Sequence, residues 1–321
     1  MRIRLATFNI ENLGRRTGSI LPIEVRRPTL QAQLARLDAD VLCLQEVNAQ
    51  ETKPGPGRQL LDLDVVLAGT PYAAFERACT VRKSGVGPLD IHNLVTLSRW
   101  PIRHTRQLWN ELLEAPSYRR ASGASATVPW DRPILLIEIS LGDKRPLHVI
   151  NLHLRAPPAA YVADQKLASG EWKSVGGWAE GLFATTVKRA GQGLEVRLAV
   201  DRIFDADVEA LIAVAGDFNA ASREVPVRMV RGDPAETGNA ALAARALVPL
   251  ADALGADAFT VVHGERRFML DHILASRALA LACREIAIDN ASLLDDTEDE
   301  ALAARRPGSY HAPVVAEFEL S

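Results

Sequence analysis

Cysteine is scarce in this chain of 321 residues, and its three cysteines show no metal-type spacing. The thiols of Cys43, Cys79 and Cys283 are odd in number, which argues against a disulfide framework and favours a reducing compartment. The N-terminus has too short an apolar run for a signal peptide, and no window is long and apolar enough to span a membrane. We therefore expect a cytoplasmic protein with no membrane insertion.

Lysine is also rare, with six residues, and the net charge is only −3. A chain without a lysine-rich stripe or a basic excess gives no indication of tight, salt-driven binding to bulk nucleic acid. Net charge does not describe a local groove, so small phosphoesters and nucleic acid both stay candidate substrates. Nothing in the pattern indicates an obligate protein partner.

Apolar, β-prone runs alternate with helical patterns along the whole chain, without a composition break or a flexible linker. This order predicts an α/β fold with packed sheets in one domain over residues 1–321. We expect strands over residues 3–10, 41–47, 63–67, 73–81, 94–98, 134–141, 147–154, 211–215, 259–262, 268–275, 286–288 and 314–320. We expect helices over residues 28–37, 185–204 and 240–247, a turn at 101–102, irregular structure over 155–182 and a solvated loop over 293–306. Hairpins should join 134–141 to 147–154 and 259–262 to 268–275.

Six short stretches place acids, amides or histidines beside an apolar run. Strand ends that meet at one rim of a sheet deliver such side chains to a common site. The stretches are Thr7–Asn12, Leu44–Val47, Val149–Leu154, Gly216–Asn219, Leu270–Leu274 and Ser309–Val314.

The six stretches resemble those of the endonuclease/exonuclease/phosphatase superfamily, which includes deoxyribonuclease I, apurinic endonucleases and neutral sphingomyelinases. The most specific pieces are Gly-Asp-Phe-Asn at 216–219 and Leu-Asp-His-Ile-Leu at 270–274, in that order. The resemblance runs from residue 7 to about 318. It implies a four-layer αββα sandwich, in which two mixed β-sheets pack face to face with helices outside. It also implies a divalent-metal-dependent phosphoesterase, most simply a nuclease-like phosphodiesterase.

The resemblance makes Glu46 the principal metal ligand and Glu11 a second or alternative one. Oxygen ligands of this kind suit Mg²⁺ or Mn²⁺. One position departs from the family pattern, because Tyr310 stands where an Asp that helps to bind the metal usually precedes the last histidine. A neutral phenol is a poor ligand for Mg²⁺. Either Glu11 compensates, or metal affinity is lowered, or catalysis is impaired.

Four residues are candidates for catalysis by the same resemblance. Asp217 would position or deprotonate the attacking water, and His311 with Asp271 would form a carboxylate–imidazole dyad. His153 would contact phosphate or protonate the leaving oxygen, and Glu76 is the candidate for its carboxylate partner. Which group is the base stays open.

A further set of residues is expected to bind the phosphate, namely Asn9, Asn219, Asn151 and Arg132. Asn9 lies two residues before Glu11, and Asp217 two before Asn219, so each pair shares one face of an extended chain. His272 is expected to be a structural histidine, because strand alternation turns it away from the face of Asp271.

Two further questions have alternatives. The chain is either an active phosphoesterase or a catalytically impaired member that binds phosphorylated ligands or a protein, a reading that Tyr310 supports. The segment 155–182, with Trp172 and Trp178, either contacts bases or sugars or packs its own indoles.

Overall fold

A computed structural model describes residues 1–14, 21–52, 57–120, 122–297 and 307–321. Two six-stranded sheets form its centre, and each contains both parallel and antiparallel pairs. The first has the order β17-β18-β1-β2-β6-β5, with β1 (Arg2–Leu13), β2 (Val41–Val47), β5 (Glu76–Cys79), β6 (Asn93–Ser98), β17 (Cys283–Ile288) and β18 (Val314–Glu319). The second has the order β13-β16-β12-β11-β10-β7, with β7 (Ile102–Leu108), β10 (Ile134–Ile139), β11 (Leu147–His153), β12 (Leu211–Asp217), β13 (Val248–Pro249) and β16 (Asp271–Ala275).

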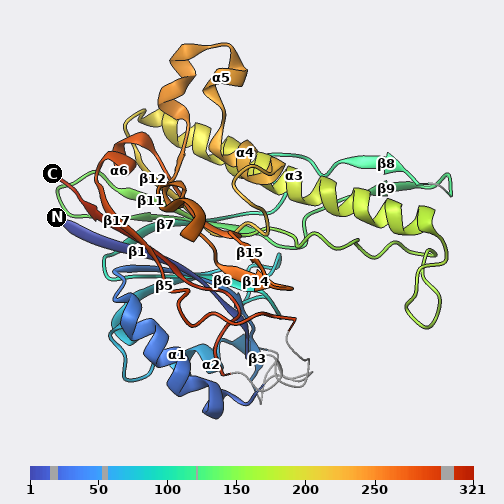
Figure 1. The fold of residues 1–321 in the computed structure, drawn as a ribbon, viewed down its shortest axis with the longest axis horizontal. Coiled ribbons are helices and arrows are strands. Elements are labelled where there is room, and N and C mark those ends of the chain that lie inside the picture. The colour runs from blue at the N-terminus through green and yellow to red at the C-terminus, as the bar shows by residue number, and fades with distance from the viewer. Residues whose placement is uncertain (15–20, 53–56, 121, 298–306) are drawn as a thin grey trace.

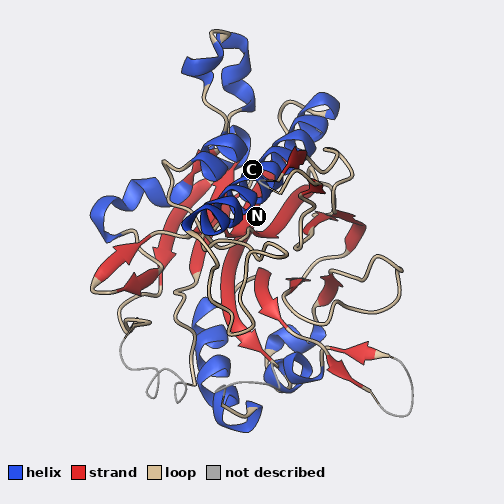
Figure 2. Ribbon diagram, turned by 90° about the vertical axis from the view of Figure 1, so that its right-hand side faces the viewer, coloured by secondary structure: helices blue, strands red, loops and turns tan. Residues whose placement is uncertain are grey.

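The two sheets pack face to face, with helices on both outer faces (Figures 1 and 2). The inner faces share one apolar core, which includes Leu5 and Val41 of the first sheet and Val149 and Ala213 of the second. This follows from strand alternation, which sends every second side chain to the inner face. The outer faces bury separate apolar clusters against helices. The predicted four-layer sandwich is therefore confirmed.

The outer layers consist of two helix pairs. Helices α1 (Ile23–Leu37) and α2 (Leu61–Leu67) cover the first sheet, and α3 (Val175–Ala206) and α4 (Val225–Arg231) cover the second. Helix α1 begins before the expected residue 28, so Pro28 lies inside its first turns. The remaining elements are η1 (Pro71–Ala74), α5 (Pro234–Thr237), η2 (Ala240–Arg245), η3 (Leu250–Asp257), α6 (Arg277–Leu281) and the small hairpins β3 (Gln50–Glu51) with β4 (Arg58–Gln59), β8 (Ser117–Arg119) with β9 (Ser125–Thr127), and β14 (Val261–His263) with β15 (Arg266–Phe268). Among the described residues, no helix has the length and apolar character needed to cross a membrane.

Two expected elements of the first half were wrong and a third was only partly right. Residues 63–67 are helical, because Leu63, Val66 and Leu67 fall on one buried helical face, although the alternating sequence mimics a strand. Residues 73–81 begin as the 3₁₀ turn η1, and only Glu76–Cys79 forms a strand. The expected turn at 101–102 instead opens β7, an edge strand whose many polar residues conceal it.

The second half also differs from expectation. The hairpin at 259–275 turns at Gly264 between β14 and β15, and β16 is a separate strand of the large sheet. The helix expected over 240–247 is the 3₁₀ segment η2. Of the loop expected over 293–306, residues 298–306 lie outside the described residues.

Helix α3 begins ten residues before the expected position 185 and occupies part of the segment expected to be irregular. Its glycines lower helix propensity, which hides the helix in the sequence. They serve close packing instead, since a Cβ atom on Gly191 would lie 2.0 Å from Cη2 of Trp130. Ser174 caps the new start by accepting a hydrogen bond from the Gly177 N–H. The N-terminal half of α3, residues 155–174 and the β8–β9 hairpin project from the sandwich together, and we call them the arm (Figure 1).

Gly216 offers a test of how tightly the two central strands are paired. It has φ of +149°, and a Cβ atom there would lie 2.0 Å from the carbonyl oxygen of Leu152 in β11. We expect Gly216→Ala to lower the free energy of unfolding by about 3 kcal/mol or more, measured by urea denaturation. Gly142→Ala is the matched control, because Gly142 also has positive φ but has nothing within 4 Å of its Cβ position. Its loss should stay near 1 kcal/mol; equal losses would refute the steric explanation.

Candidate active site at one edge of the sandwich

The predicted site residues of both sheets meet at one edge of the sandwich. Strands β1 and β2 are parallel, as are β11 and β12, so each pair delivers its carboxyl ends to the same rim. Asn9 connects the two sheets there, because its Nδ2 donates to Oδ2 of Asp217 at 3.0 Å and to Oε1 of Glu46 at 3.3 Å. Asn9 and Asp217 thus meet although they lie 208 positions apart in the sequence.

Several of these side chains sit on backbone that non-glycine residues rarely adopt. Positive φ angles occur at Glu11 (52°), Asn12 (47°), Glu46 (61°), His92 (56°) and Asn219 (49°). The register of β1 against β2 shifts over the same region, between Asn9 and Leu13. Such conformations cost energy and gather at functional sites, where the surrounding structure holds them. Here the Asn12 N–H donates to Oε2 of Glu46 at 3.0 Å and so fixes that carboxylate.

Glu46, His153 and Asp217 form a buried group of opposite charges. Nε2 of His153 lies 3.2 Å from Oδ2 of Asp217 and 3.7 Å from Oε1 of Glu46. Burial raises the pKa of the Glu46 carboxyl, but the charges of His153 and other cations outweigh it, and the net pKa lies below its usual value. The pKa of Asp217 is lowered for the same reason, since His153 offsets the cost of burial. Both groups are therefore carboxylates near neutral pH.

His153 does not pair with Glu76, and that expectation was wrong. Oε2 of Glu76 accepts a hydrogen bond from the Ile102 N–H at 2.7 Å, where β5 and β7 come together. The partners of His153 are instead the two carboxylates that carry the site. Sequence reasoning missed this because Glu46 already had a role as a metal ligand, and the second pairing needs the two sheets to be docked.

His311 and Asp271 form the expected dyad, with Nδ1 of His311 2.8 Å from Oδ2 of Asp271. Burial would lower the pKa of His311, but the Asp271 carboxylate, with help from Asp217 and Glu46, raises it to about 10. Ser309 holds the loop in place, because its hydroxyl donates to the Asn9 carbonyl at 2.7 Å and accepts from the His311 N–H at 3.0 Å. The imidazole of His311 is therefore protonated and positively charged at neutral pH.

The expected phosphate binders have different positions. Asn219 adjoins Asp217, since its N–H donates to Oδ1 at 2.7 Å and its Nδ2 to Oδ2 at 3.2 Å. Arg132 donates to the Leu154 carbonyl at 3.0 Å; burial lowers its pKa, and Glu46 and Asp217 oppose that change. Both residues therefore border the site.

Asn151 is not brought to the surface of the site. It is fully buried between the sheets, where its Oδ1 accepts from Nε2 of Gln45 at 2.8 Å and its Nδ2 donates to the Val95 carbonyl at 3.1 Å. A buried amide with these partners fixes the docking of the sheets. This geometry gives Asn151 no open face for a substrate.

Glu11 and Tyr310 meet through the backbone. Oε2 of Glu11 accepts from the Tyr310 N–H at 2.8 Å, and burial raises the pKa of the Glu11 carboxyl. Tyr310 lines a separate cavity of about 200 Å³ together with Thr29 and Gln33 of α1. His272 has the expected structural place, because it is buried and its Nε2 lies 2.8 Å from the Ala220 carbonyl.

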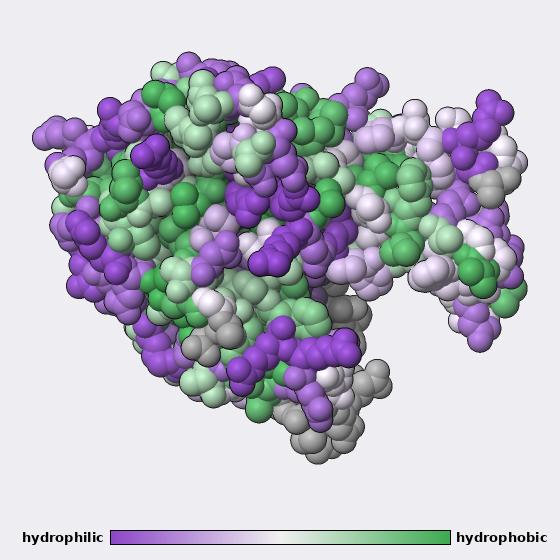
Figure 3. Space-filling model, turned by 45° about the horizontal axis from the view of Figure 1, so that its top comes forward, coloured by the Kyte–Doolittle hydropathy of each residue, from purple (hydrophilic) through white to green (hydrophobic). Residues whose placement is uncertain are grey.

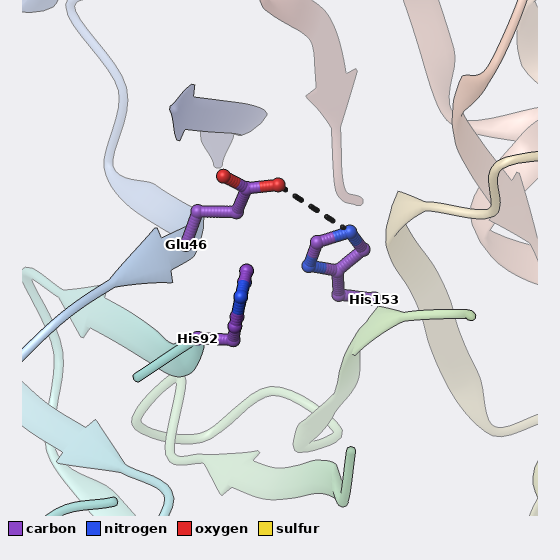
Figure 4. Close-up of side chains that lie close together, drawn as sticks. All are labelled: Glu46, His92 and His153. Carbon is purple, nitrogen blue, oxygen red and sulfur yellow. Dashed lines mark ion pairs between the residues drawn. The ribbon is translucent and has the colours of Figure 1, made fainter. Parts of the chain in front are cut away.

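Two residues near the site were missed from the sequence. Arg26 of α1 donates to the carbonyls of Glu11 and Ile10 at 2.8 and 2.9 Å, which supports the end of β1. His92 lies beside His153, with ring centroids 6.0 Å apart (Figure 4). Neither belongs to a motif, and the loop that carries His92 has no repeated pattern to mark it.

Two groups of side chains could hold a cation among the described residues. Glu46, His92 and His153 each offer one ligand atom within 4.8 Å of the others, and so do Asp217, Asp271 and His311. In the first group, Nδ1 of His153 is buried without a hydrogen-bond partner in the described chain, as expected of a nitrogen that awaits a ligand. The donor set therefore fits a divalent metal at Glu46.

The arm is fixed to the body beside this site. Glu195 of α3 is fully buried, and its carboxylate accepts from the Trp130 indole N–H at 2.6 Å and from the Glu111 N–H at 2.7 Å. Farther out, Lys166 lies over the ring of Trp172 at 3.8 Å, whereas Trp178 is 44% exposed. One indole of the segment is thus packed and the other is open to solvent.

The His311–Asp271 pair gives a pH-dependent stability with a definite sign. The pKa of His311 is about 10 in the folded chain and about 6.5 unfolded. A raised pKa means that the stabilisation is complete below about pH 6.5 and is lost as pH rises toward 10. The unfolding free energy of the chain should therefore approach that of His311→Gln over this range, measured by urea denaturation with chelator present. The exposed His104→Gln variant is the control. A difference in unfolding free energy between the parent chain and His311→Gln that widens as pH rises would contradict the pairing.

Comparison with known proteins agrees with the fold. Truncated TDP2 from Caenorhabditis elegans has a TM-score of 0.59 at 15% identity, over 99% of this chain and 98% of that one. NExo, a 3′ phosphatase from Neisseria solved with a product DNA hairpin, has a TM-score of 0.56 at 16% identity, over 99% and 100%. A search of curated proteins found no match. The Endonuclease/Exonuclease/phosphatase family profile matches residues 6–311, and the chain therefore belongs to this family.

Proposed function

We propose that this chain is a divalent-metal-dependent hydrolase of phosphodiester bonds, most simply of nuclease type. The observation that carries the proposal is the network at the sandwich edge, where Asn9 joins Glu46 to Asp217 and Asp271 holds His311. Membership of a family of phosphoesterases supports the reaction class. A cation held at Glu46, the Mg²⁺ or Mn²⁺ that the sequence indicates, would neutralise charge on the phosphate when bound.

The residues divide the chemistry according to their charges. Asp217 is a carboxylate near neutral pH and accepts hydrogen bonds from Asn9 and Asn219. It is suited to orient water for in-line attack and to accept its proton. His311 is cationic at the same pH. It is therefore suited to bind the phosphate oxygens, and Asp217 is the better candidate for the base.

The remaining side chains bind and orient. Arg132 supplies a guanidinium beside the carboxylates, and Asn9 and Asn219 fix the Asp217 oxygens. Glu11 lies close enough to Glu46 to raise its own pKa further, so it would be a second ligand or a proton-bearing neighbour. Preorganised charge of this kind is the main source of rate in phosphoryl transfer.

A second candidate is a member with impaired catalysis that binds phosphorylated ligands or a protein. Tyr310 favours it, because this residue lines the cavity near α1 and gives no carboxylate to the site. Against it stands the complete set of charged partners at Asp217 and His311, which a binding protein does not require. Chelator-treated protein that shows no heat of Mg²⁺, Mn²⁺ or Zn²⁺ binding at millimolar concentration would favour this candidate.

Hydrolysis of an activated phosphodiester tests the main proposal. With a panel of divalent ions we expect turnover that chelator abolishes, and we expect Asp217→Asn and His311→Ala each to lower kcat at least about 100-fold. Glu138→Gln is the control, because in the described chain this residue pairs with His104 of β7 and His148 of β11 and with none of the proposed site residues. Turnover that survives both chelator and His311→Ala would exclude the mechanism.

The arm suggests an extended substrate. It presents exposed Trp178, Tyr161 and Phe183, and Figure 3 shows the molecule hollowed between the arm and the body. Aromatic side chains stack on bases without regard to sequence. Arg155, whose N–H donates to Gln192 of α3 at 3.0 Å, continues directly from the strand that carries His153.

We expect Trp178→Ala to raise KM for a single-stranded oligonucleotide about fivefold and to leave the activated small phosphodiester unaffected. Leu281→Ala, which removes an exposed apolar side chain of α6, is the control. An equal effect on both substrates would show that Trp178 acts through folding. Assays with plasmid DNA, phosphoinositide and sphingomyelin beside the oligonucleotide would identify the substrate class.

A further inference from the structure

The group Glu46, His92 and His153 is chemically unlike a carboxylate magnesium site. Its three ligand atoms lie within 4.8 Å of one another, and two of the three belong to imidazoles (Figure 4). Each side chain comes from a different segment: Glu46 from β2, His92 from the loop before β6, and His153 from the end of β11. Both sheets therefore have to dock before the group exists.

The two ring nitrogens of His153 have different surroundings. Nε2 faces the carboxylates of Asp217 and Glu46 at 3.2 and 3.7 Å. Nδ1 is buried, has no hydrogen-bond partner among the described residues, and faces His92 in Figure 4. The carboxylates hold one ring proton on Nε2, so a metal would bind at Nδ1 in place of the second proton, the one that makes the ring cationic. Carboxylate–histidine–metal arrangements use this principle, and their outer carboxylates fix the ligand.

His92 is held for such a role by its backbone. Its φ is +56°, and its N–H donates to Oδ1 of Asn48 at 2.9 Å. It also lines a cleft of about 700 Å³ with Asn12, Arg58 and Asp90, so one side of His92 faces open space. A metal with bonds of about 2.1 Å allows ligand atoms up to about 4.2 Å apart. The ligand atoms therefore have to come closer together when a metal binds, which a partly exposed side chain such as His92 allows.

We propose that Glu46, His92 and His153 bind a late first-row transition metal of the zinc type in preference to Mg²⁺. Imidazole ligands favour zinc, iron and nickel, whereas Mg²⁺ requires oxygen. Two histidines, one glutamate and an open position make a recurrent catalytic zinc set. The proposal deepens the function proposed above by changing its metal.

Cobalt absorption tests the proposal without any assay of activity. Chelator-treated protein titrated with Co²⁺ should develop visible bands that saturate at one equivalent, that one equivalent of Zn²⁺ removes, and that a hundredfold excess of Mg²⁺ leaves in place. His92→Ala should weaken Co²⁺ binding at least tenfold, whereas the control His104→Ala, an exposed histidine of β7, should bind as the parent does. Circular dichroism checks that each variant is folded.

A second variant keeps the test decisive if His92→Ala fails to fold. His92→Asp replaces an imidazole by a carboxylate, and we expect it to shift preference toward Mg²⁺ and Mn²⁺ and to weaken the cobalt bands. Removal of the bands by Mg²⁺ in the parent protein, or equal Co²⁺ affinity in the parent and His92→Ala, would overturn the assignment. Hydrolysis that Mg²⁺ supports as well as Zn²⁺ does in the parent protein would also overturn it while leaving the phosphoesterase intact. Cobalt binding at one equivalent without any hydrolysis would leave the metal site standing and remove the phosphoesterase.

Discussion

The site depends on one contact, the Asn9 amide that donates to carboxylates of both sheets. Asn9 belongs to β1, Glu46 to β2 and Asp217 to β12. The contact therefore forms only when these three strands of the two sheets are correctly positioned. Carboxylates at this depth are costly unless hydrogen bonds and opposite charges compensate them. Asn9 supplies the hydrogen bonds, and His153 and His311 supply the charge. Folding and assembly of the site are therefore coupled, because neither sheet alone stabilises the buried carboxylates of Glu46 and Asp217.

The sequence made the strand ends predictable and left their partnerships open. Runs such as Val41–Val47 and Leu211–Asp217 end in the expected polar residues, because buried strands have an unmistakable apolar composition. The pairing of His153 with Glu46 and Asp217 was not predictable, since it arises between sheets. His92 had no signal at all: it lies 46 residues from Glu46, outside any motif, on positive-φ backbone. Asn151 is an error of the opposite kind. Its motif indicated a phosphate-binding residue, but the side chain is buried between the sheets and holds them together.

The misread elements share a physical cause. Local pattern favoured a strand over residues 63–67 and a weak helix start near 185, but tertiary packing decided both. In α3, Gly191, one of the glycines that discouraged a helix, leaves room for Trp130, and the buried Glu195 accepts the indole N–H of that residue. Helix propensity predicts structure poorly at positions where a close contact requires a residue without a Cβ atom. A glycine in a helical sequence can therefore mark a contact and not an end.

Charge also explains why the Asp271–His311 pair and the surroundings of His153 differ in their capacity to bind a cation. Asp271 and His311 form an ion pair at 2.8 Å through Oδ2 of Asp271, while its Oδ1 is buried without a hydrogen-bond partner in the described chain. Around His153 the balance is incomplete, because Nδ1 has no partner in the described chain and Glu46 lies 3.7 Å from Nε2. A cation placed there would complete that balance, whereas one placed between Asp271 and His311 would have to displace a formed ion pair. This difference favours the Glu46 side for the proposed metal and leaves His311 for the proposed contact with an anionic substrate.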